Sequence, residues 1–173
     1  DSGGERNLLA DDAEDVGLKY AVLSDETMEK LEDIQEYGQH ASNPLDPWGT
    51  GIDFEKIFGD SMSCMLRDEN AAIGLMSQDL RDGYYLSEGC IQALKQGHDE
   101  TGKPVVFLTN FGGIRRKELT ERINEIPAPV LTGTKMALKA VRNYLEFRDF
   151  EFESASAEKL EVNDETAELI KTS

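Results

Sequence analysis

The sequence has few of the residues on which catalytic and metal sites most often depend. Its 173 residues include only two cysteines, Cys64 and Cys90, and two histidines, His40 and His98. The absence of a Cys-x-x-Cys pair argues against a structural zinc site and a disulfide scaffold, and favours a reducing, cytoplasmic environment. We expect both cysteines to be inert core thiols and His98 to stabilise a helix end. We therefore predict neither a catalytic residue nor a metal site in this chain.

Long hydrophobic runs and positive charge are also scarce. No segment approaches the roughly 18 apolar residues of a membrane span, and no charged-then-apolar signal opens the chain. Lys and Arg number 18 against 35 Asp and Glu, so the net charge is −17. Such a surface repels the phosphates of nucleic acids and of anionic lipids, and we expect neither as a partner. The content of 39% hydrophobic and 31% charged residues predicts one globular domain with a sizeable core.

Short apolar runs alternate with helical patterns along the chain. Strands are expected at residues 18–24, 71–77, 103–110 and 128–132, and helices at 1–17, 25–38, 52–68, 87–102, 116–126 and 134–150. Buried parallel strands give unbroken apolar runs of this kind. The alternation therefore predicts an α/β fold, in which a parallel sheet carries helices on both faces in three layers.

Several helices have recognisable starts and apolar faces. Ser24 is expected to cap the helix over 25–38, and Thr50 with Asp53 fits a capping box for the helix over 52–68. The apolar stripe of that second helix consists of Phe54, Ile57, Phe58, Ser61, Met62 and Met65. The stripe expected for the helix over 134–150 consists of Met136, Ala137, Ala140, Val141, Tyr144 and Leu145.

The two ends of the sequence differ from its middle. The chain opens on a Gly-Gly turn followed by a helical pattern that Gly17 ends. Because chains rarely start at such a turn, we expect a preceding strand, and hence a sheet whose first strand is missing here. Residues 151–173 are acidic, rich in serine and poor in aromatics, which is typical of a linker. The predicted organisation is a domain over 1–150 followed by a linker over 151–173.

Four glycine-bearing segments fall where strands should end and helices begin. They cover residues 2–4, 43–51, 77–83 and 109–113. In a parallel sheet all four gather at one edge, where free backbone N–H groups and helix dipoles would suit a phosphoryl group.

Each segment also has an ordinary structural interpretation. Gly112 and Gly113 can form a simple tight turn. Asn43 and Asp46 can tie their loop together through hydrogen bonds to the backbone. Asp79 can belong to a solvated, charged turn. The residues alone leave both interpretations open.

The order of these segments resembles that of a known family. The relevant stretches are "SGGERNLLADDAEDVGL", an Asn-Pro-x-Asp loop in "ASNPLDPWGTG", a buried strand leading into "SQDLRDG", then "GKPVVFLTNFGG" and "IPAPVLTGTKMALKAVRNYLEFRDF". This ordered set, over residues 1–150, resembles the second CoA-ligase-type domain of the ADP-forming acyl-CoA synthetases. These are acetate–CoA ligase relatives of succinyl-CoA synthetase, and the domain is flavodoxin-like.

The resemblance implies a role within a larger acid–thiol ligase. Such enzymes join a carboxylic acid to CoA, use ATP and Mg, and release ADP and phosphate through a phosphohistidine. That histidine lies in a Gly-His-x-Gly context in another domain, and neither His40 nor His98 matches it. The implied partners are the CoA-binding, phosphohistidine and ATP-grasp domains of the same enzyme, with the ATP-grasp module beyond the linker. The chain alone would bind no cofactor and be inactive.

The resemblance also implies that this domain helps to stabilise the phosphohistidine through its glycine-rich loops and helix N-termini. The positions expected to face it are Ser2, Gly3, Gly4, Asn43, Asp46, Gly49, Thr50, Gly51, Gln78, Asp79, Asn110, Gly112 and Gly113.

Three other classes of protein stay open. A receiver-like domain fits the α/β pattern, but the usual acidic pair is absent and "APVLTG" carries no lysine. A nucleotide-binding module would need Gly-x-Gly-x-x-Gly or Gly-x-x-x-x-Gly-Lys-Ser/Thr, and neither occurs. A purely structural or interaction domain is the third, and an exposed sheet edge could support a homodimer.

Overall fold

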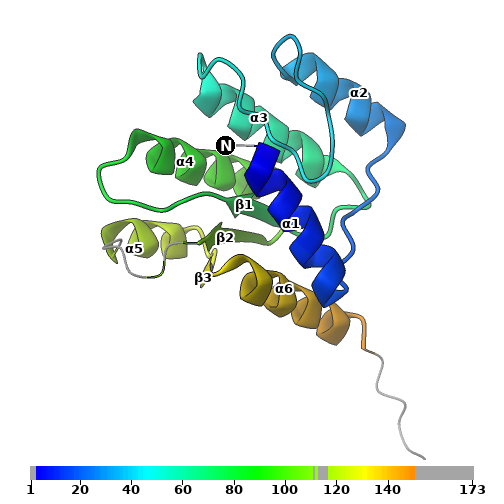
Figure 1. Cartoon of the computed structure of the whole chain (residues 1–173), viewed down its shortest axis with the longest axis vertical. Coiled ribbons are helices and arrows are strands. Elements are labelled where there is room, and N and C mark those ends of the chain that lie inside the picture. The colour runs from blue at the N-terminus through cyan, green and yellow to red at the C-terminus, as the bar shows by residue number, and fades with distance from the viewer. Residues whose placement is uncertain (1–2, 111, 113–116, 151–173) are drawn as a thin grey trace, which may run out of the picture.

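The computed structural model describes residues 3–110, 112 and 117–150. Helices and strands alternate over most of this length (Figure 1). The elements are α1 (Gly3–Val16), α2 (Asp25–Ile34), α3 (Phe54–Arg67), β1 (Gly74–Ser77), α4 (Tyr85–Thr101), β2 (Val105–Thr109), α5 (Lys117–Glu125), β3 (Val130–Thr132) and α6 (Thr134–Arg148). The predicted linker, residues 151–173, lies outside the described residues.

The three described strands form one parallel sheet in the order β1-β2-β3. Gly74 pairs with Val105, and Phe107 pairs with Val130. Helices cover both faces of the sheet, so the molecule has three layers (Figure 1). The predicted α/β class is confirmed, and the arrangement is consistent with a flavodoxin-like fold.

Strand β2 is the centre of the core because all five of its residues are buried. Successive side chains of a strand point to opposite faces. Phe107 therefore packs with α3, α4 and α5, whereas Leu108 packs with α1 and α6. An unbroken apolar run is what burial on both faces requires.

The N-terminal helices agree with the sequence analysis. Helix α1 buries Leu9, Ala13 and Val16 and is followed by Gly17 at φ 73°. Helix α2 starts after Ser24, whose hydroxyl oxygen accepts a hydrogen bond from the Thr27 N–H at 3.3 Å. The predicted cap of α2 is thus confirmed, although this helix ends at Ile34 rather than at 38.

The predicted capping box of α3 is wrong. The residue that precedes the helix, Asp53, has φ 53° and makes no side-chain cap. The Thr50 hydroxyl instead donates to Glu36 Oε1 at 2.8 Å, because the 43–51 loop folds back onto the end of α2. The amphipathic pattern itself is confirmed by the burial of Phe58, Ser61 and Met62.

The strand predicted at 18–24 does not form. Side chains from elsewhere bind its backbone groups: Asn43 donates to Ala21 O at 3.0 Å, and Asn70 donates to Val22 O at 2.8 Å. Within the described residues, no backbone hydrogen bond joins residues 18–23 to β1. An apolar run becomes a strand only if a neighbouring strand is available to pair with it. Among the described residues, one edge of β1 consequently has no partner strand.

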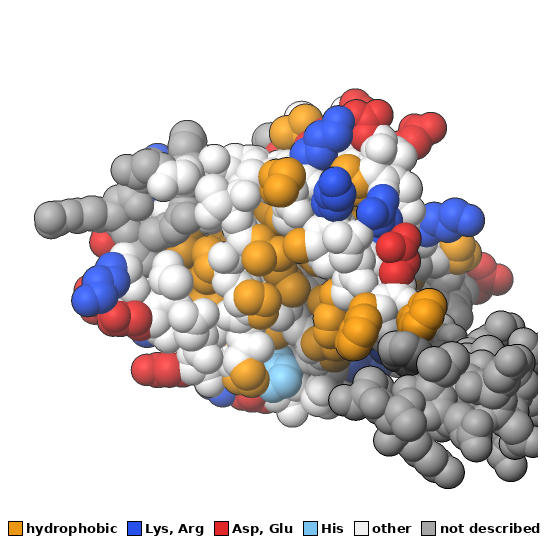
Figure 2. Space-filling view, turned by 90° about the horizontal axis from the view of Figure 1, so that it is seen from below, with side chains coloured by type: hydrophobic (Ala, Val, Ile, Leu, Met, Phe, Trp, Pro, Cys, Tyr) orange, Lys and Arg blue, Asp and Glu red, His pale blue; other side chains and the backbone are white. Residues whose placement is uncertain are grey.

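The remaining strands are shorter than predicted, and the apolar stripe of α6 is partly wrong. Helix α6 buries Ala137 and Leu138 against α1 and the sheet, and Val141 is buried as well. Met136 and Tyr144, by contrast, are 70% and 51% exposed. The face of the molecule that includes α6 carries a group of hydrophobic side chains at its surface (Figure 2).

Close contact between α3 and α4 depends on Gly97. A Cβ atom there would lie 2.5 Å from Met62 Cγ and 3.0 Å from Leu66 Cδ1. Gly97→Ala is expected to lower the free energy of unfolding by about 1 kcal/mol, because overpacking outweighs the gain in helix propensity. Chemical denaturation measures this. Gly59→Ala is the matched control, because its Cβ would meet only the mobile end of Gln96, and unchanged or higher stability is expected there. Equal effects of the two substitutions would contradict the packing argument.

Candidate functional site

The predicted edge forms at the carboxyl ends of the strands. Parallel strands end on the same side, so Ser77, Thr109 and Thr132 mark one edge of the sheet. The start of α1 reaches this edge, because the Ser77 hydroxyl donates to Glu5 Oε1 at 3.1 Å. Gly3 and Gly4, in the first turn of α1, therefore belong to the same region. Ser2 and Gly113 lie outside the described residues.

The loop between β1 and α4 is held firmly at this edge. The Leu80 N–H donates to Thr109 Oγ1 at 3.1 Å, and the Ser87 hydroxyl donates to the Asp79 carbonyl oxygen at 3.1 Å. Gln78 is buried, and its N–H donates to Leu108 O at 3.0 Å. Burial raises the pKa of Asp79, and the neighbouring charge of Glu5 raises it further. Asp79 therefore lies in a partly buried loop and not in the solvated, charged turn that the sequence also allowed.

The loop over residues 43–51 is held by its own side chains. Asn43 donates to Ala21 O, and the Trp48 N–H donates to Asp46 Oδ1 at 3.3 Å. The hydrogen bond expected of Asp46 within its loop is therefore present, whereas Asn43 binds the 18–24 segment and not its own loop. The proposed ligand-facing role of both residues stays a prediction.

A carboxylate binds part of the same loop. Both the backbone N–H and the hydroxyl of Thr50 donate to Glu36. A Cβ atom at Gly49 would overlap the end of the Glu36 side chain, so a larger residue there would make this side chain move. Glu36 is not recognisable as a loop contact from the sequence. It lies in an acidic, helix-like stretch, and no local pattern shows which of its carboxylates binds a loop farther along the chain. An external anion at the Thr50 N–H would have to displace this side chain.

An aromatic cluster joins the 43–51 loop to the β1–α4 loop. Trp48 lies 5.7 Å from Phe54, which in turn lies 5.7 Å from Tyr85, measured between ring centroids. Tyr84 packs against Tyr85, and the Arg81 guanidinium lies 4.2 Å from the centre of the Tyr84 ring. Edge-on aromatic packing of this kind fixes the two loops relative to each other. No local sequence pattern reveals this cluster, because Trp48 and Phe54 are far from Tyr84 and Tyr85 in the chain.

Asn110 links the end of β2 to the start of α6. Its Oδ1 accepts from the Thr134 N–H at 3.1 Å and from the Thr134 hydroxyl at 2.5 Å. Its side chain thus satisfies a free N–H at the helix start, as an N-cap does. Gly112 is exposed, and a Cβ atom there would only touch Thr132 Cγ2 at 3.5 Å. Packing therefore does not require glycine at this position.

Replacing Asn110 with alanine is expected to lower the free energy of unfolding by about 1 kcal/mol, the usual effect of losing a helix cap. Thermal denaturation measures the change. Asn143→Ala is the control, because Asn143 is exposed on α6 and, among the described residues, its side chain accepts a hydrogen bond only from its neighbour Arg142. If the two variants melted at the same temperature, the capping role of Asn110 would be wrong.

The chemically reactive side chains lie away from this edge or are blocked. His98 bonds to the Lys103 carbonyl oxygen through Nδ1 at 2.8 Å, near the C-terminal end of α4. Burial raises the pKa of the Cys90 thiol to about 12 and also raises that of Cys64, so neither is a thiolate at neutral pH. Within the described residues, no group of three or more His, Cys, Asp or Glu side chains is placed to hold a metal ion.

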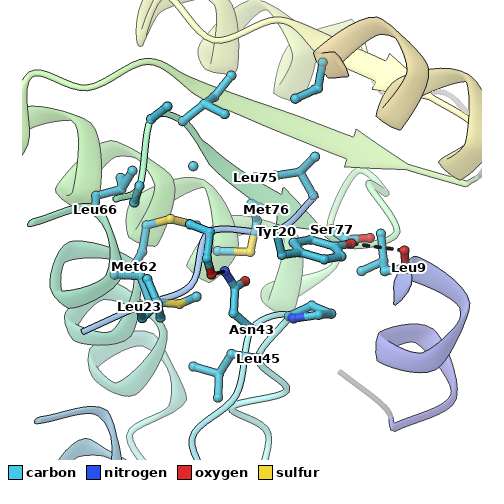
Figure 3. A pocket seen from close by; sticks show the side chains of 18 of the residues that line it. Leu9, Tyr20, Leu23, Asn43, Leu45, Met62, Leu66, Leu75, Met76 and Ser77 are labelled. Atoms are coloured by element: carbon cyan, nitrogen blue, oxygen red, sulfur yellow. Dashed lines mark hydrogen bonds between the residues drawn. The ribbon is translucent and has the colours of Figure 1, made fainter. Parts of the chain in front are cut away.

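An apolar groove runs beside the edge, along β1 (Figure 3). Its volume is about 370 Å³. Asn43, Asp46 and all of β1 line it, together with Glu5, the residue that follows the predicted 2–4 segment. Three of the four predicted segments thus contribute to the groove or adjoin it. The fourth, represented by Asn110, follows β2, the next strand of the sheet.

Where the structure describes the chain, no helix has the length and apolar content to span a membrane.

The fold and this edge define a flavodoxin-like α/β domain with a polar strand-end region. No model of a known protein family matches the chain. The chain is 27% identical over 147 residues to a protein described as "Trans-feruloyl-CoA synthase FCS1" from an unknown prokaryotic organism. That match covers 82% of this chain and 20% of the relative, so the chain spans about one fifth of its length.

A solved structure is similar as well. It is the crystal structure of PH0766 from Pyrococcus horikoshii OT3, with a TM-score of 0.62 and 23% sequence identity. The similarity covers 84% of this chain and 33% of that one. At this level of identity the likeness shows the fold. The sequence match adds that the chain is similar to part of a CoA synthase.

Proposed function

We propose that this chain is a domain of an ADP-forming acyl-CoA synthetase. Such a ligase converts a carboxylic acid, CoA and ATP into acyl-CoA, ADP and phosphate. The observation that carries the proposal is the 147-residue similarity to a trans-feruloyl-CoA synthase. In this proposal CoA, ATP and Mg bind to other domains of the full enzyme, which also has CoA-binding, phosphohistidine and ATP-grasp domains.

The proposed role of this domain is to hold its strand-end edge against a phosphohistidine that another domain supplies. The start of α1 and the loops that follow β1 and β2 meet at this edge, which supports the role. Backbone N–H groups and helix dipoles in fixed positions stabilise a phosphoryl group without reorganising. They would act only on a group that the partner domain brings into place.

The charges at the edge limit what the isolated chain can bind. Glu5, Asp46 and Asp79 lie near the start of α1 or line the adjoining groove, and each can carry a negative charge. These negatively charged carboxylates repel a free anion. Inorganic phosphate is therefore expected to bind weakly, and the chain alone is expected to turn over no substrate.

Intact-protein mass spectrometry tests whether the phosphohistidine lies in another domain, as proposed. The chain is incubated with Mg-ATP and, separately, with acetyl phosphate. The expected result is no added phosphoryl group under either condition. An acid-labile phosphoryl group on His40 or His98 would place the phosphohistidine in this chain and contradict the proposal. A phosphoryl group on an aspartate would instead support the receiver-like alternative.

A further inference from the structure

A polar cleft runs along α3, which lies between α2 and α4 (Figure 1). The volume of the cleft is about 830 Å³, which is within the usual size of small-molecule sites. Helix α3 contributes Asp60, Ser63 and Arg67 to its lining. The apolar groove along β1 is lined instead by Met62 and Leu66 of this helix (Figure 3). The two openings therefore lie on different faces of α3.

Two contacts between α2 and α3 fix the order of the residues along the cleft. Near the start of α2, the carbonyl oxygen of Thr27 accepts a hydrogen bond from the Cys64 thiol at 3.8 Å. Just after α2, the Gln35 side chain donates to Ser61 Oγ at 3.0 Å. The two helices are therefore antiparallel, and residues later in α2 lie opposite residues earlier in α3.

The hydroxyl of Ser63 is buried and unpaired at the cleft. Ser63 is 1% exposed and belongs to the lining, and within the described residues its Oγ has no hydrogen-bond partner. Proteins pair nearly all of their buried polar atoms, because a buried hydroxyl without a partner is costly. A polar group bound in the cleft would supply the missing partner.

Two cations lie on either side of this hydroxyl. Arg67 is one turn after Ser63 on α3, and Lys30 lines the cleft from α2. The hydrogen bond with Glu26 raises the pKa of Lys30, whereas the charge of Arg67 acts in the opposite direction, as expected for two cations that lie close together. Their carboxylate partners, Glu26 at 2.6 Å and Glu100 at 2.7 Å, form exposed ion pairs, which are weak. A ligand carboxylate could therefore bind both cations.

Two carboxylates mark the other end of the cleft. Asp33 follows Lys30 by one turn of α2, and Asp60 precedes Ser63 by one turn of α3. Because the helices are antiparallel, Asp33 and Asp60 lie toward the same end. The hydrogen bond from Lys56 holds the pKa of Asp60 below its ordinary value, so this group is charged at neutral pH. This end of the cleft suits an ammonium group.

We propose that the cleft between α2 and α4 binds a small zwitterion, with a carboxylate at one end and an ammonium group at the other. The carboxylate lies between Lys30 and Arg67 and accepts a hydrogen bond from the Ser63 hydroxyl. The ammonium group lies between Asp33 and Asp60. A ligand with only one of these charges would leave one end of the cleft without a counter-charge. The inference does not rest on the proposed ligase function.

Three probes of similar length test the proposal. γ-Aminobutyrate carries both charges, butyrate carries only the carboxylate and butylamine carries only the ammonium group. Each is titrated into the full chain while the backbone amide signals of Ser63 and Arg67 are followed by NMR. γ-Aminobutyrate is expected to bind about tenfold more tightly than either of the other two, since it alone pairs with both ends.

Replacing Ser63 with alanine is expected to weaken the binding of γ-aminobutyrate about tenfold. Its melting temperature is expected to stay the same or to rise, because an unpaired buried hydroxyl is removed. Ser61→Ala is the matched control, because it removes a buried hydroxyl that Gln35 does bind. This variant should melt at a lower temperature and keep the affinity of the parent chain.

Four results would overturn the proposal. Butylamine that binds as tightly as γ-aminobutyrate would indicate general attraction of cations to an acidic surface, and butyrate that does so would indicate an anion site. The absence of saturable binding of γ-aminobutyrate would exclude the site. An unchanged affinity of Ser63→Ala would show that the Ser63 hydroxyl does not contact the ligand.

Discussion

Replacing Asp68 with alanine is expected to lower the free energy of unfolding at pH 7 by about 3 kcal/mol. Asp68 is buried, and its carboxylate accepts from the N–H and hydroxyl of Ser24, both at 2.8 Å, and from the Asn70 N–H at 2.9 Å. Hydrogen bonds to a charged group contribute about 1.5–3 kcal/mol, and donors left unpaired add to the cost. The carboxylate thus joins the start of α2 to the end of α3. Urea denaturation measures the change.

The control is Asp149→Ala, because Asp149 is exposed and, in the described part of the chain, forms an ion pair only with its neighbour Arg148. Its unfolding midpoint is expected to stay that of the parent chain. If Asp68→Ala were as stable as Asp149→Ala, the link between α2 and α3 would not depend on this carboxylate.

Asp68 also predicts a dependence of stability on pH. Hydrogen bonds from the Thr27 hydroxyl and from the Ser24 and Asn70 N–H groups hold the pKa of Asp68 well below its ordinary value. A carboxyl whose pKa is lower in the folded state stabilises the protein above its unfolded pKa, about 3.9. This contribution is lost as the pH falls below about 4. The stability of Asp68→Asn is therefore expected to fall less steeply than that of the parent between pH 4 and pH 2, and equal slopes would contradict the assignment.

Replacing Phe107 with alanine is expected to lower the free energy of unfolding by about 4 kcal/mol. Phe107 is fully buried at the centre of β2 and packs in the cluster formed by α3, α4 and α5. Removing a large core side chain loses its burial and leaves a cavity that the rigid sheet cannot close. Chemical denaturation monitored by circular dichroism measures the effect.

Phe147→Ala is the matched control, because Phe147 is 76% exposed at the end of α6. A change within about 0.5 kcal/mol is expected there. Similar losses from the two phenylalanines would show that β2 is not the centre of the core.

The class of fold could be predicted from the sequence because buried strands and amphipathic helices leave local patterns. The runs around Val105 and Phe107 are apolar at every position, and burial on both faces explains why. Residues 18–24 have a comparable apolar content but form no strand. Their state depends on a neighbouring strand and on the distant side chains Asn43 and Asn70, which no local pattern reveals.

The candidate site was predictable in its location but not in its details. Glycine-bearing loops at strand ends must gather at one edge of a parallel sheet, and Gly4 and Asp79 do so. The contact of Glu36 with Thr50 and the cap that Asn110 provides to Thr134 join residues 14 and 24 positions apart. Contacts of that kind are set by tertiary folding, so the sequence offered no signal for them.

The proposed ligase role is tested most directly by a chimera of the trans-feruloyl-CoA synthase in which this chain replaces the 147 matched residues. The measurement is the formation of acyl-CoA and ADP from ATP, with a version that lacks the region as control. The account predicts that the chimera forms both products and that the deletion forms neither. A folded chimera that forms no acyl-CoA, or that releases AMP in place of ADP, would contradict the account.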